Sequence, residues 1–242
     1  MTPGAAPCAA QRSRGAPVPR LLLCLLVAAL PLGAAAAMAT GAVASPGTPA
    51  ARHLAAELLI LRGDLRRLDE KPGLPPANRL GLRERVTSEL GLLPWLMREA
   101  GDAAGAARLR RWQQRSLDDE AARRRLTQVV VAAVLRHPFD ASAFLTPAPT
   151  VARLRQARAI DNAYCAACHR GTGEGMAEAV LPARDLALMA RREPESEFLA
   201  RLVLGVRGDE TIGFANPLTD AEIGAMLVMF RSAGAPRSRV PG

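Results

Sequence analysis

Three residues in the C-terminal half of the chain have the spacing of a cofactor-attachment motif. Cys165, Cys168 and His169 lie in the stretch "YCAACHRGTGEGM", residues 164–176. Two cysteines at this spacing can each form a thioether to one vinyl group of the same haem, and the histidine that follows can bind its iron. The sequence therefore predicts one covalently bound haem c, attached through Cys165 and Cys168, with His169 as the metal ligand.

Other uses of a Cys-x-x-Cys pair are a free dithiol, a small disulfide and half of a zinc site. A thioredoxin-like dithiol normally lies near a βαβ unit, and the sequence has no strand–helix–strand pattern. A zinc site needs further ligands, usually from a second cysteine or histidine pair, and neither residue type occurs after His169. We therefore expect haem attachment rather than these alternatives.

The first 44 residues are typical of a secretory signal peptide. Arg12, Arg14 and Arg20 form a basic start, residues 21–30 are apolar, and a small-x-small cleavage site follows at residues 42–44. The alternative is an uncleaved anchor, because the uncharged stretch is long enough to span a bilayer. In either case we expect an exported, periplasmic protein, and any membrane contact would be through this segment.

The composition of the chain favours helices and limits its partners. Alanine, leucine and arginine dominate, and aromatic residues make up 3%. Removal of Cys8 and Cys24 with the signal peptide leaves only the motif pair, which excludes a disulfide scaffold. The net charge is +9, and we interpret it as scattered surface arginine. Acidic redox proteins are more plausible partners than nucleic acid, and no oligomeric state is indicated.

The sequence pattern of residues 45–145 predicts an antiparallel helical bundle of unknown role. Leucines at spacings of three and four indicate a first helix over residues 50–69. Three more are expected over residues 76–92, over 102–114, and from an N-cap at Ser116 to His137–Pro138. We expect Pro94 to begin a separate turn. We expect Trp95 and Trp112 to pack in the core. We expect His53 and His137 to lie on the surface or at helix ends.

Residues 146–242 predict a second domain that begins near Thr146. A helix from Val151 leads into Cys165 and is followed by a glycine-rich loop, a helix over residues 195–206 and a last helix over 220–233. Thr219 and Glu222 have the spacing of a capping box at the start of that last helix.

Residues 151–242 resemble a class I mono-haem cytochrome c domain. The resemblance is carried by the cysteine–histidine motif, the helix before it, Leu181–Pro182, and the ending "LTDAEIGAMLVMF". It implies an all-α domain wrapped around one haem, in which the Pro182 carbonyl orients His169. It also implies that Ile223, Leu227 and Phe230 of the last helix pack across the first helix near Ala157 and Ile160.

The chain departs from this family at the second iron ligand. Thr211 and Ile212 occupy the positions where the family has a Met-Pro pair. Other candidates for the second ligand are water and six residues: Met176, Met189, Met226, Met229, His53 and His137. Packing is the expected role of each methionine, and we expect an open, weakly ligated or non-standard iron rather than an ordinary His/Met pair.

The resemblance implies electron transfer between periplasmic proteins, with no reaction catalysed by this chain. One alternative is a haem-based sensor of small ligands, and another is the haem subunit of a larger redox enzyme. Peroxidase-type chemistry needs distal acid–base groups, and the haem domain has no second histidine.

Overall fold

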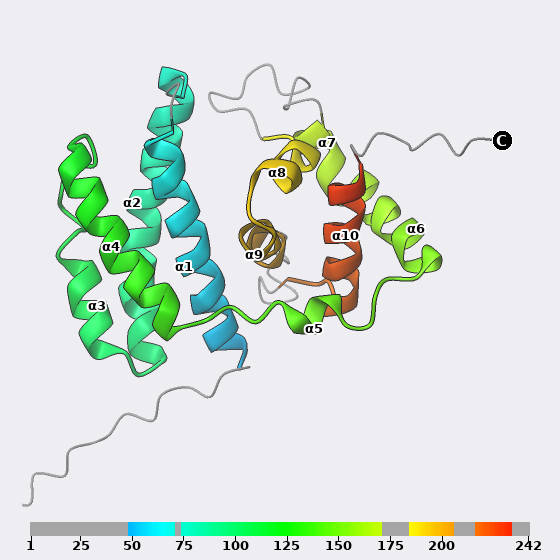
Figure 1. The fold of residues 1–242 in the computed structure, drawn as a ribbon, viewed down its shortest axis with the longest axis horizontal. Coiled ribbons are helices and arrows are strands. Elements are labelled where there is room, and N and C mark those ends of the chain that lie inside the picture. Colours follow the sequence, from blue (N-terminus) through cyan, green and yellow to red (C-terminus); the bar gives the residue numbers. More distant parts are fainter. Residues whose placement is uncertain (1–47, 71–73, 171–183, 206–215, 234–242) are drawn as a thin grey trace, which may run out of the picture. The chain divides into compact units, whose positions relative to one another are not determined.

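The chain folds into helices. The computed structural model describes residues 48–70, 74–170, 184–205 and 216–233, and every regular element among them is a helix, which confirms the all-α class (Figure 1). None of the described helices has the length and apolar character needed to cross a membrane. The elements are α1 (Pro49–Leu68), α2 (Pro76–Glu99), α3 (Ala103–Arg110), α4 (Glu120–Arg136), α5 (Ser142–Leu145), α6 (Val151–Ile160), the π-helical turn η1 (Asp161–Cys165), α7 (Ala166–His169), α8 (Leu186–Arg192), α9 (Glu195–Gly205) and α10 (Asp220–Ser232).

Helices α1–α4 pack around one apolar cluster, as the leucine spacing predicts. The side chain of Thr48 accepts a hydrogen bond from the Ala51 N–H and so caps α1. The inward stripe of this helix is almost fully buried and consists of Leu54, Leu58, Leu61, Leu65 and Leu68. Because these positions lie on one face of the helix, their burial fixes which side of α1 faces the other three helices.

Helix α2 continues through Pro94 to Glu99, so the predicted end at Leu92 and the separate turn are wrong. A proline inside a helix removes the N–H that would bind the carbonyl four residues earlier. Here that carbonyl belongs to Leu90, and it accepts a hydrogen bond from the Gln113 side chain at 3.0 Å. The Gln113 side chain thus replaces the lost donor, so the freed carbonyl is satisfied within the continuous helix.

Three further details differ from the predictions. Helix α3 ends at Arg110 rather than near residue 114, and α4 is capped by Asp119 rather than Ser116. The Ser116 hydroxyl instead accepts a hydrogen bond from the Asp118 N–H. Trp112 is buried as predicted, whereas Trp95 is 52% exposed and does not belong to the core.

The remaining helices form a second apolar cluster in which α6 packs against α10. Ala157 and Ile160 from α6 and the three predicted residues of α10 are all buried in it, so this pairing is confirmed. The predicted capping box at Thr219 and Glu222 is also present. It fixes the start of α10 and therefore the register in which this helix meets α6.

The two clusters lie within one compact unit, residues 41–242. Helix α1 packs directly on α9, and at Gly63 the two are so close that an added Cβ would lie 1.9 Å from the Glu197 carboxylate. Arg52 of α1 also donates a hydrogen bond to Asp220 at the start of α10, at 2.8 Å. The N-terminal cluster ends within α4 and the C-terminal cluster begins with residues of and before α5, such as Phe144, and these contacts join the two clusters.

A backbone-to-backbone contact at Gly224 is expected to make this glycine essential for the C-terminal cluster. A Cβ there would lie 1.7 Å from the Phe144 carbonyl oxygen, whereas a Cβ at Gly91 of α2 would meet nothing within 4 Å. We expect Gly224→Ala to lower the free energy of unfolding by about 1–3 kcal/mol through overpacking. The matched variant Gly91→Ala should raise it by about 0.5–1 kcal/mol. Urea unfolding of both variants measures this, and equal effects would contradict the close contact.

Candidate functional site

The cysteine–histidine motif is held at the end of one continuous helical segment, from Val151 to His169. The Thr150 side chain caps its start by accepting a hydrogen bond from the Arg153 N–H. At the first motif residue the segment widens into a π-turn, Asp161–Cys165, where the Ala166 N–H donates to the Asp161 carbonyl. Such single-turn insertions are frequent at functional sites. The segment that the sequence predicts to lead into Cys165 is therefore present, with this irregularity at its end.

The two cysteines differ in exposure. Cys165 is buried and Cys168 is exposed, and both are free thiols. Burial, together with the negative charges of Asp161 and Cys168, raises the pKa of the Cys165 thiol to about 11. Because the thiolate is the nucleophile in thiol–disulfide exchange, Cys165 is poorly suited to act as a redox-active cysteine at neutral pH.

One ring nitrogen of His169 is already occupied. Its Nδ1 lies 2.8 Å from the Arg184 carbonyl oxygen. A carbonyl can only accept, so we assign Nδ1 as the N–H donor, which leaves Nε2 as the nitrogen with a free lone pair. The predicted partner, Pro182, lies outside the described residues, and the carbonyl that the structure assigns to Nδ1 is two residues further along.

Cys165 and His169 line the same cavity, which has a volume of about 580 Å³. Cofactor and ligand sites typically measure about 300–1,000 Å³. Its walls come from α1, α2, the motif segment, α8 and α9, so both parts of the chain contribute to it. The described lining residues are Glu57, Ile60, Arg85, Ser88, Glu89, Leu92, Tyr164, Cys165, His169, Leu186, Met189, Arg201, Leu202, Leu204 and Gly205.

A second cavity, of about 540 Å³, also includes His169 in its lining but not Cys165. Charged residues contribute much of this lining, among them Arg158, Asp161 and Arg170. Of these two cavities formed by described residues, the first is the one that both Cys165 and His169 line, so it is the candidate space for a cofactor bound through the two residues.

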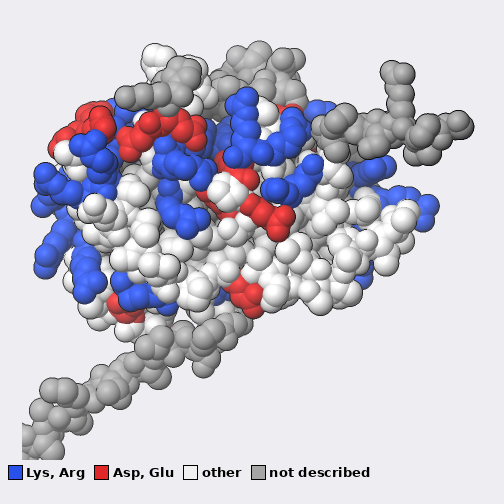
Figure 2. All heavy atoms as spheres, in the orientation of Figure 1, with Lys and Arg blue, Asp and Glu red and all other residues white. Residues whose placement is uncertain are grey.

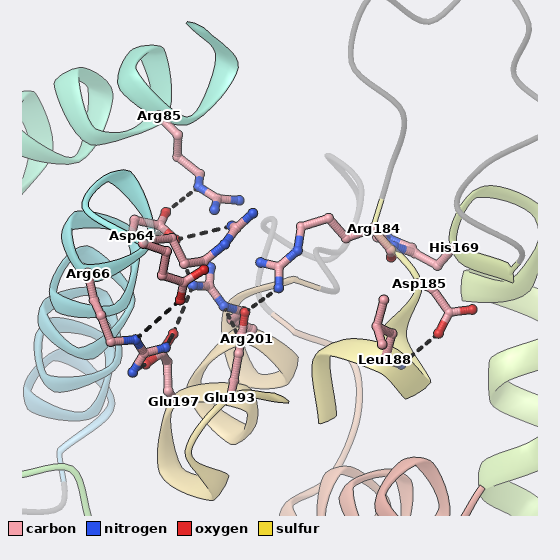
Figure 3. A network of polar contacts seen from close by, with 12 residues as sticks. Asp64, Arg66, Arg85, His169, Arg184, Asp185, Leu188, Glu193, Glu197 and Arg201 are labelled. Atoms are coloured by element: carbon pink, nitrogen blue, oxygen red, sulfur yellow. Dashed lines mark hydrogen bonds and ion pairs between the residues drawn. The ribbon is translucent and has the colours of Figure 1, made fainter. Parts of the chain in front are cut away.

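A buried ion-pair network connects α1 with α9 beside the cavity (Figure 3). Arg201 of α9 donates to Asp64 of α1 at 2.7 Å, and Asp64 also accepts a hydrogen bond from Arg85 of α2. Burial alone would raise the pKa of the Asp64 carboxyl, but the charges of Arg201 and Arg85 outweigh it, and the pKa lies below its ordinary value. Asp64 is therefore ionised and holds three helices together.

The same network reaches the segment that orients His169. Arg201 donates to Glu193 at 2.8 Å, and Glu193 in turn accepts a hydrogen bond from the Arg184 side chain. The backbone carbonyl of Arg184 is the partner of His169 Nδ1. A continuous series of contacts thus runs from Asp64 in α1 to the predicted metal ligand, as Figure 3 shows.

Glu89 of α2 is the least well compensated charge-bearing group of the first cavity. The residue is 6% exposed, and its Oε2 is buried without a hydrogen-bond partner. The nearest cation is Arg85, whose Nε lies 4.0 Å from Oε1. Burial raises the pKa of this carboxyl well above its ordinary value, and the negative charge of Asp64 raises it further.

The methionines that are candidates for the second iron ligand differ in where they lie. Met226 and Met229 are buried in the C-terminal cluster, which agrees with a packing role. Met189 belongs to the same cluster and also lines the first cavity. Met176 and Thr211 lie outside the described residues.

The two other histidines form pairs with carboxylates. His137 caps the end of α4, as predicted for a helix-end residue, and its Nε2 lies 3.0 Å from Asp102. His53 lies within α1, with its Nε2 3.3 Å from Glu57. Neither histidine belongs to the described lining of the cavity that contains His169.

Sequence reasoning missed the contribution of α1 and α2 to this cavity. The signal was available at Glu89, which follows Val86 by three residues and therefore continues the apolar face of α2 with a charged side chain. Glu57 and Asp64 similarly interrupt the buried side of α1. Charged residues at core positions indicate ion pairs or a site, since they are rarely buried without a partner.

Comparisons with family models, with curated proteins and with solved structures find no match to this chain. Within the described residues there is also no cluster of three or more His, Cys, Asp or Glu side chains that could hold a metal ion. The site must therefore be interpreted from its own geometry.

Removal of Asp64 should show how strongly the structure depends on the buried network. Asp64→Ala leaves Arg201 buried without its main partner, and we expect a loss of about 3–5 kcal/mol in the free energy of unfolding. Glu70→Ala removes the exposed partner of Arg66, with 51% of the Glu70 side chain accessible, and should change stability by at most about 1 kcal/mol. Chemical denaturation of both variants tests this, and a small effect at Asp64 would show that the network is dispensable.

Glu89 should give the stability a recognisable pH dependence. Because its pKa is raised in the folded state, the native protein binds more protons than the unfolded chain from the ordinary glutamate range up to the raised value. Stability contributed by the neutral carboxyl is therefore present at low pH and declines as pH rises through that window.

The variant Glu89→Gln should lose this part of the decline in stability with pH. The control variant Glu84→Gln, which changes an exposed residue of the same helix, should retain it. Thermal unfolding of the wild type and both variants over a series of pH values measures the difference. Identical pH profiles for wild type and Glu89→Gln would show that the raised pKa is not realised.

Proposed function

We propose that the chain is an exported electron-transfer protein that carries one covalently bound haem c. The observation that carries the proposal is the state of His169. Its Nδ1 is held by a backbone carbonyl, and it lines a cofactor-sized cavity together with Cys165. A metal-binding histidine generally donates its other ring N–H to such a partner, which fixes the tautomer and the ring orientation.

Cys165 and His169 fit the proposed group, because both line the cavity, whereas Cys168 is exposed and does not belong to its described lining. Cys165 and Cys168 would supply the two thioether sulfurs, and Nε2 of His169 would bind the iron. The haem would supply a one-electron couple, whereas the protein supplies the histidine, the apolar burial and a docking face. Leu92, Leu186 and Leu202 give the cavity apolar walls from three different helices, and such walls exclude water from a cofactor.

The main alternative for the cysteines is less well supported. A dithiol–disulfide pair needs a cysteine with a lowered pKa, and Cys165 has the opposite shift because it is buried. A cysteine that is joined to haem through a thioether needs no lowered pKa in the mature protein, because its sulfur is no longer ionisable.

The proposed partners are soluble or membrane-bound redox proteins of the periplasm. Figure 2 shows Lys and Arg side chains mainly over the upper part and the edges of the visible face, with Asp and Glu side chains among them. This mixture favours the interpretation of scattered surface charge. A weak, salt-sensitive encounter with an acidic partner fits such a surface, because long-range attraction between exposed charges is screened within about 8 Å at physiological ionic strength.

A haem-based binder of small ligands is the second candidate. It is favoured by the polar groups of α1 and α2 that line the cavity with His169, including Glu57, Ser88 and Glu89. Polar groups of this kind can interact with a ligand at an open iron position. Carbon monoxide or nitric oxide added to the reduced protein distinguishes the two functions, because only an accessible iron would change its absorption spectrum.

The proposal is tested by exporting the full chain in a host that attaches haem c and purifying the processed protein. We expect the mass of one covalently bound haem, and a pigment that stays with the protein in acidified organic solvent. Cys165→Ala should leave a single attachment or none. His169→Ala should change the absorption spectrum through loss of the iron ligand.

His137→Ala provides a matched control, because this histidine pairs with Asp102 and does not belong to the described lining of the cavity. Its haem content and spectrum should equal those of the wild type. A processed, folded wild-type protein without covalent haem would overturn the proposed function.

A further inference from the structure

We propose that Glu89 is the proton-binding site of the haem cavity and takes up a proton when the haem is reduced. The inference rests on the proposed function. It assigns a role to α2, a helix to which the sequence alone assigns no function. It is carried by the cavity that Glu89 shares with Cys165 and His169 and by the unpaired, buried oxygen of the Glu89 carboxyl.

The first step is that Glu89 faces the cavity from the side of the N-terminal helices. It lies on α2, and the lining also includes Ser88 and Leu92 of the same helix. The motif segment contributes Cys165 and His169 to the same cavity. A group bound through those two residues would therefore share one cavity with the carboxyl of Glu89.

The second step is that no residue in the described part of the chain neutralises this carboxyl completely. Arg85 lies 4.0 Å from Oε1, but its Nε also donates to Asp64. Oε2 has no hydrogen-bond partner. A buried carboxylate in this position is costly unless it is paired, so its ionisation responds strongly to any change of charge in the cavity.

The third step concerns the surrounding charges, which set the direction of that response. The raised pKa of Glu89 results from burial and from the negative charges of Asp64 and Glu57, against which Arg85 and Arg201 act. Helix α3 also packs on α2 but contributes none of the described lining residues. The titratable or charged groups that face the cavity from the packed elements are Glu57 of α1, Arg85 of α2, Tyr164 and Cys165 of η1, His169 of α7 and Arg201 of α9.

The charge balance of the coupled step is simple. One electron from the redox partner reduces the ferric state to the ferrous state, which removes one positive charge from the cavity. One proton from solvent then binds Glu89 Oε2, so that the net charge of the cavity is restored. The affinity of Glu89 for the proton is higher after reduction, because the ionised carboxylate has lost an attractive charge nearby.

The test uses the purified haem-loaded full chain and measures its reduction potential by spectroelectrochemistry over a series of pH values. We expect the potential of the wild type to fall as pH rises, approaching about 59 mV per pH unit if one proton accompanies each electron. Glu89→Gln should lose at least half of that slope. Glu84→Gln, which removes an exposed carboxylate from the same helix, should keep it.

A second measurement covers the case in which the buried substitution disturbs folding. Redox-difference infrared spectra of the wild type should show the C=O stretch of a protonated carboxyl gained on reduction. The band should persist in Glu84→Gln and be absent from Glu89→Gln. Equal pH slopes for wild type and Glu89→Gln, or a wild type without the band, would overturn the inference alone. A protein without covalent haem would overturn it together with the proposed function.

Discussion

The buried ion pair between Asp64 and Arg201 is the interaction on which the rest of the structure depends. It joins α1 of the N-terminal helices to α9 of the C-terminal helices, at positions 137 residues apart in the sequence. Removing both charges from water is costly, and their attraction offsets this only when the remaining donors and acceptors are also satisfied. Arg85 and Glu193 provide those further partners, so the helices must come together as a set.

This constraint explains why an apparently separate helical bundle precedes the motif. The ion pair places α1 and α2 beside the cavity, where they contribute Glu57, Arg85 and Glu89 to its lining. The network also extends through Arg184, whose backbone carbonyl holds His169. The N-terminal helices therefore act on the motif in two ways, since they form one wall of its cavity and are connected through the ion-pair network to the segment that orients its histidine.

Local features of the fold could be predicted from the sequence because they depend on nearby residues. Leucine spacing in α1 and the capping box at Thr219 are examples. The continuation of α2 through Pro94 could not be predicted, because the freed carbonyl of Leu90 finds its donor at Gln113. For the same reason the motif residues could be identified by spacing, whereas the part of the cavity wall formed by α1 and α2 depends on long-range pairs that no local pattern reveals.

The unpaired oxygen of Glu89 is more informative than the paired charges around it. Of the three buried side-chain atoms without a hydrogen-bond partner in the described part of the chain, one belongs to Glu197, and it lies 3.1 Å from Arg66. The other two belong to Glu89 and Arg184, which lie at the cavity and at the histidine-orienting segment. Native proteins satisfy most buried polar groups, so exceptions beside a site indicate function. Under the proposed function, a network that compensates Asp64 but leaves Glu89 short of a partner would keep one carboxyl able to change its protonation state while the fold around it stays fixed.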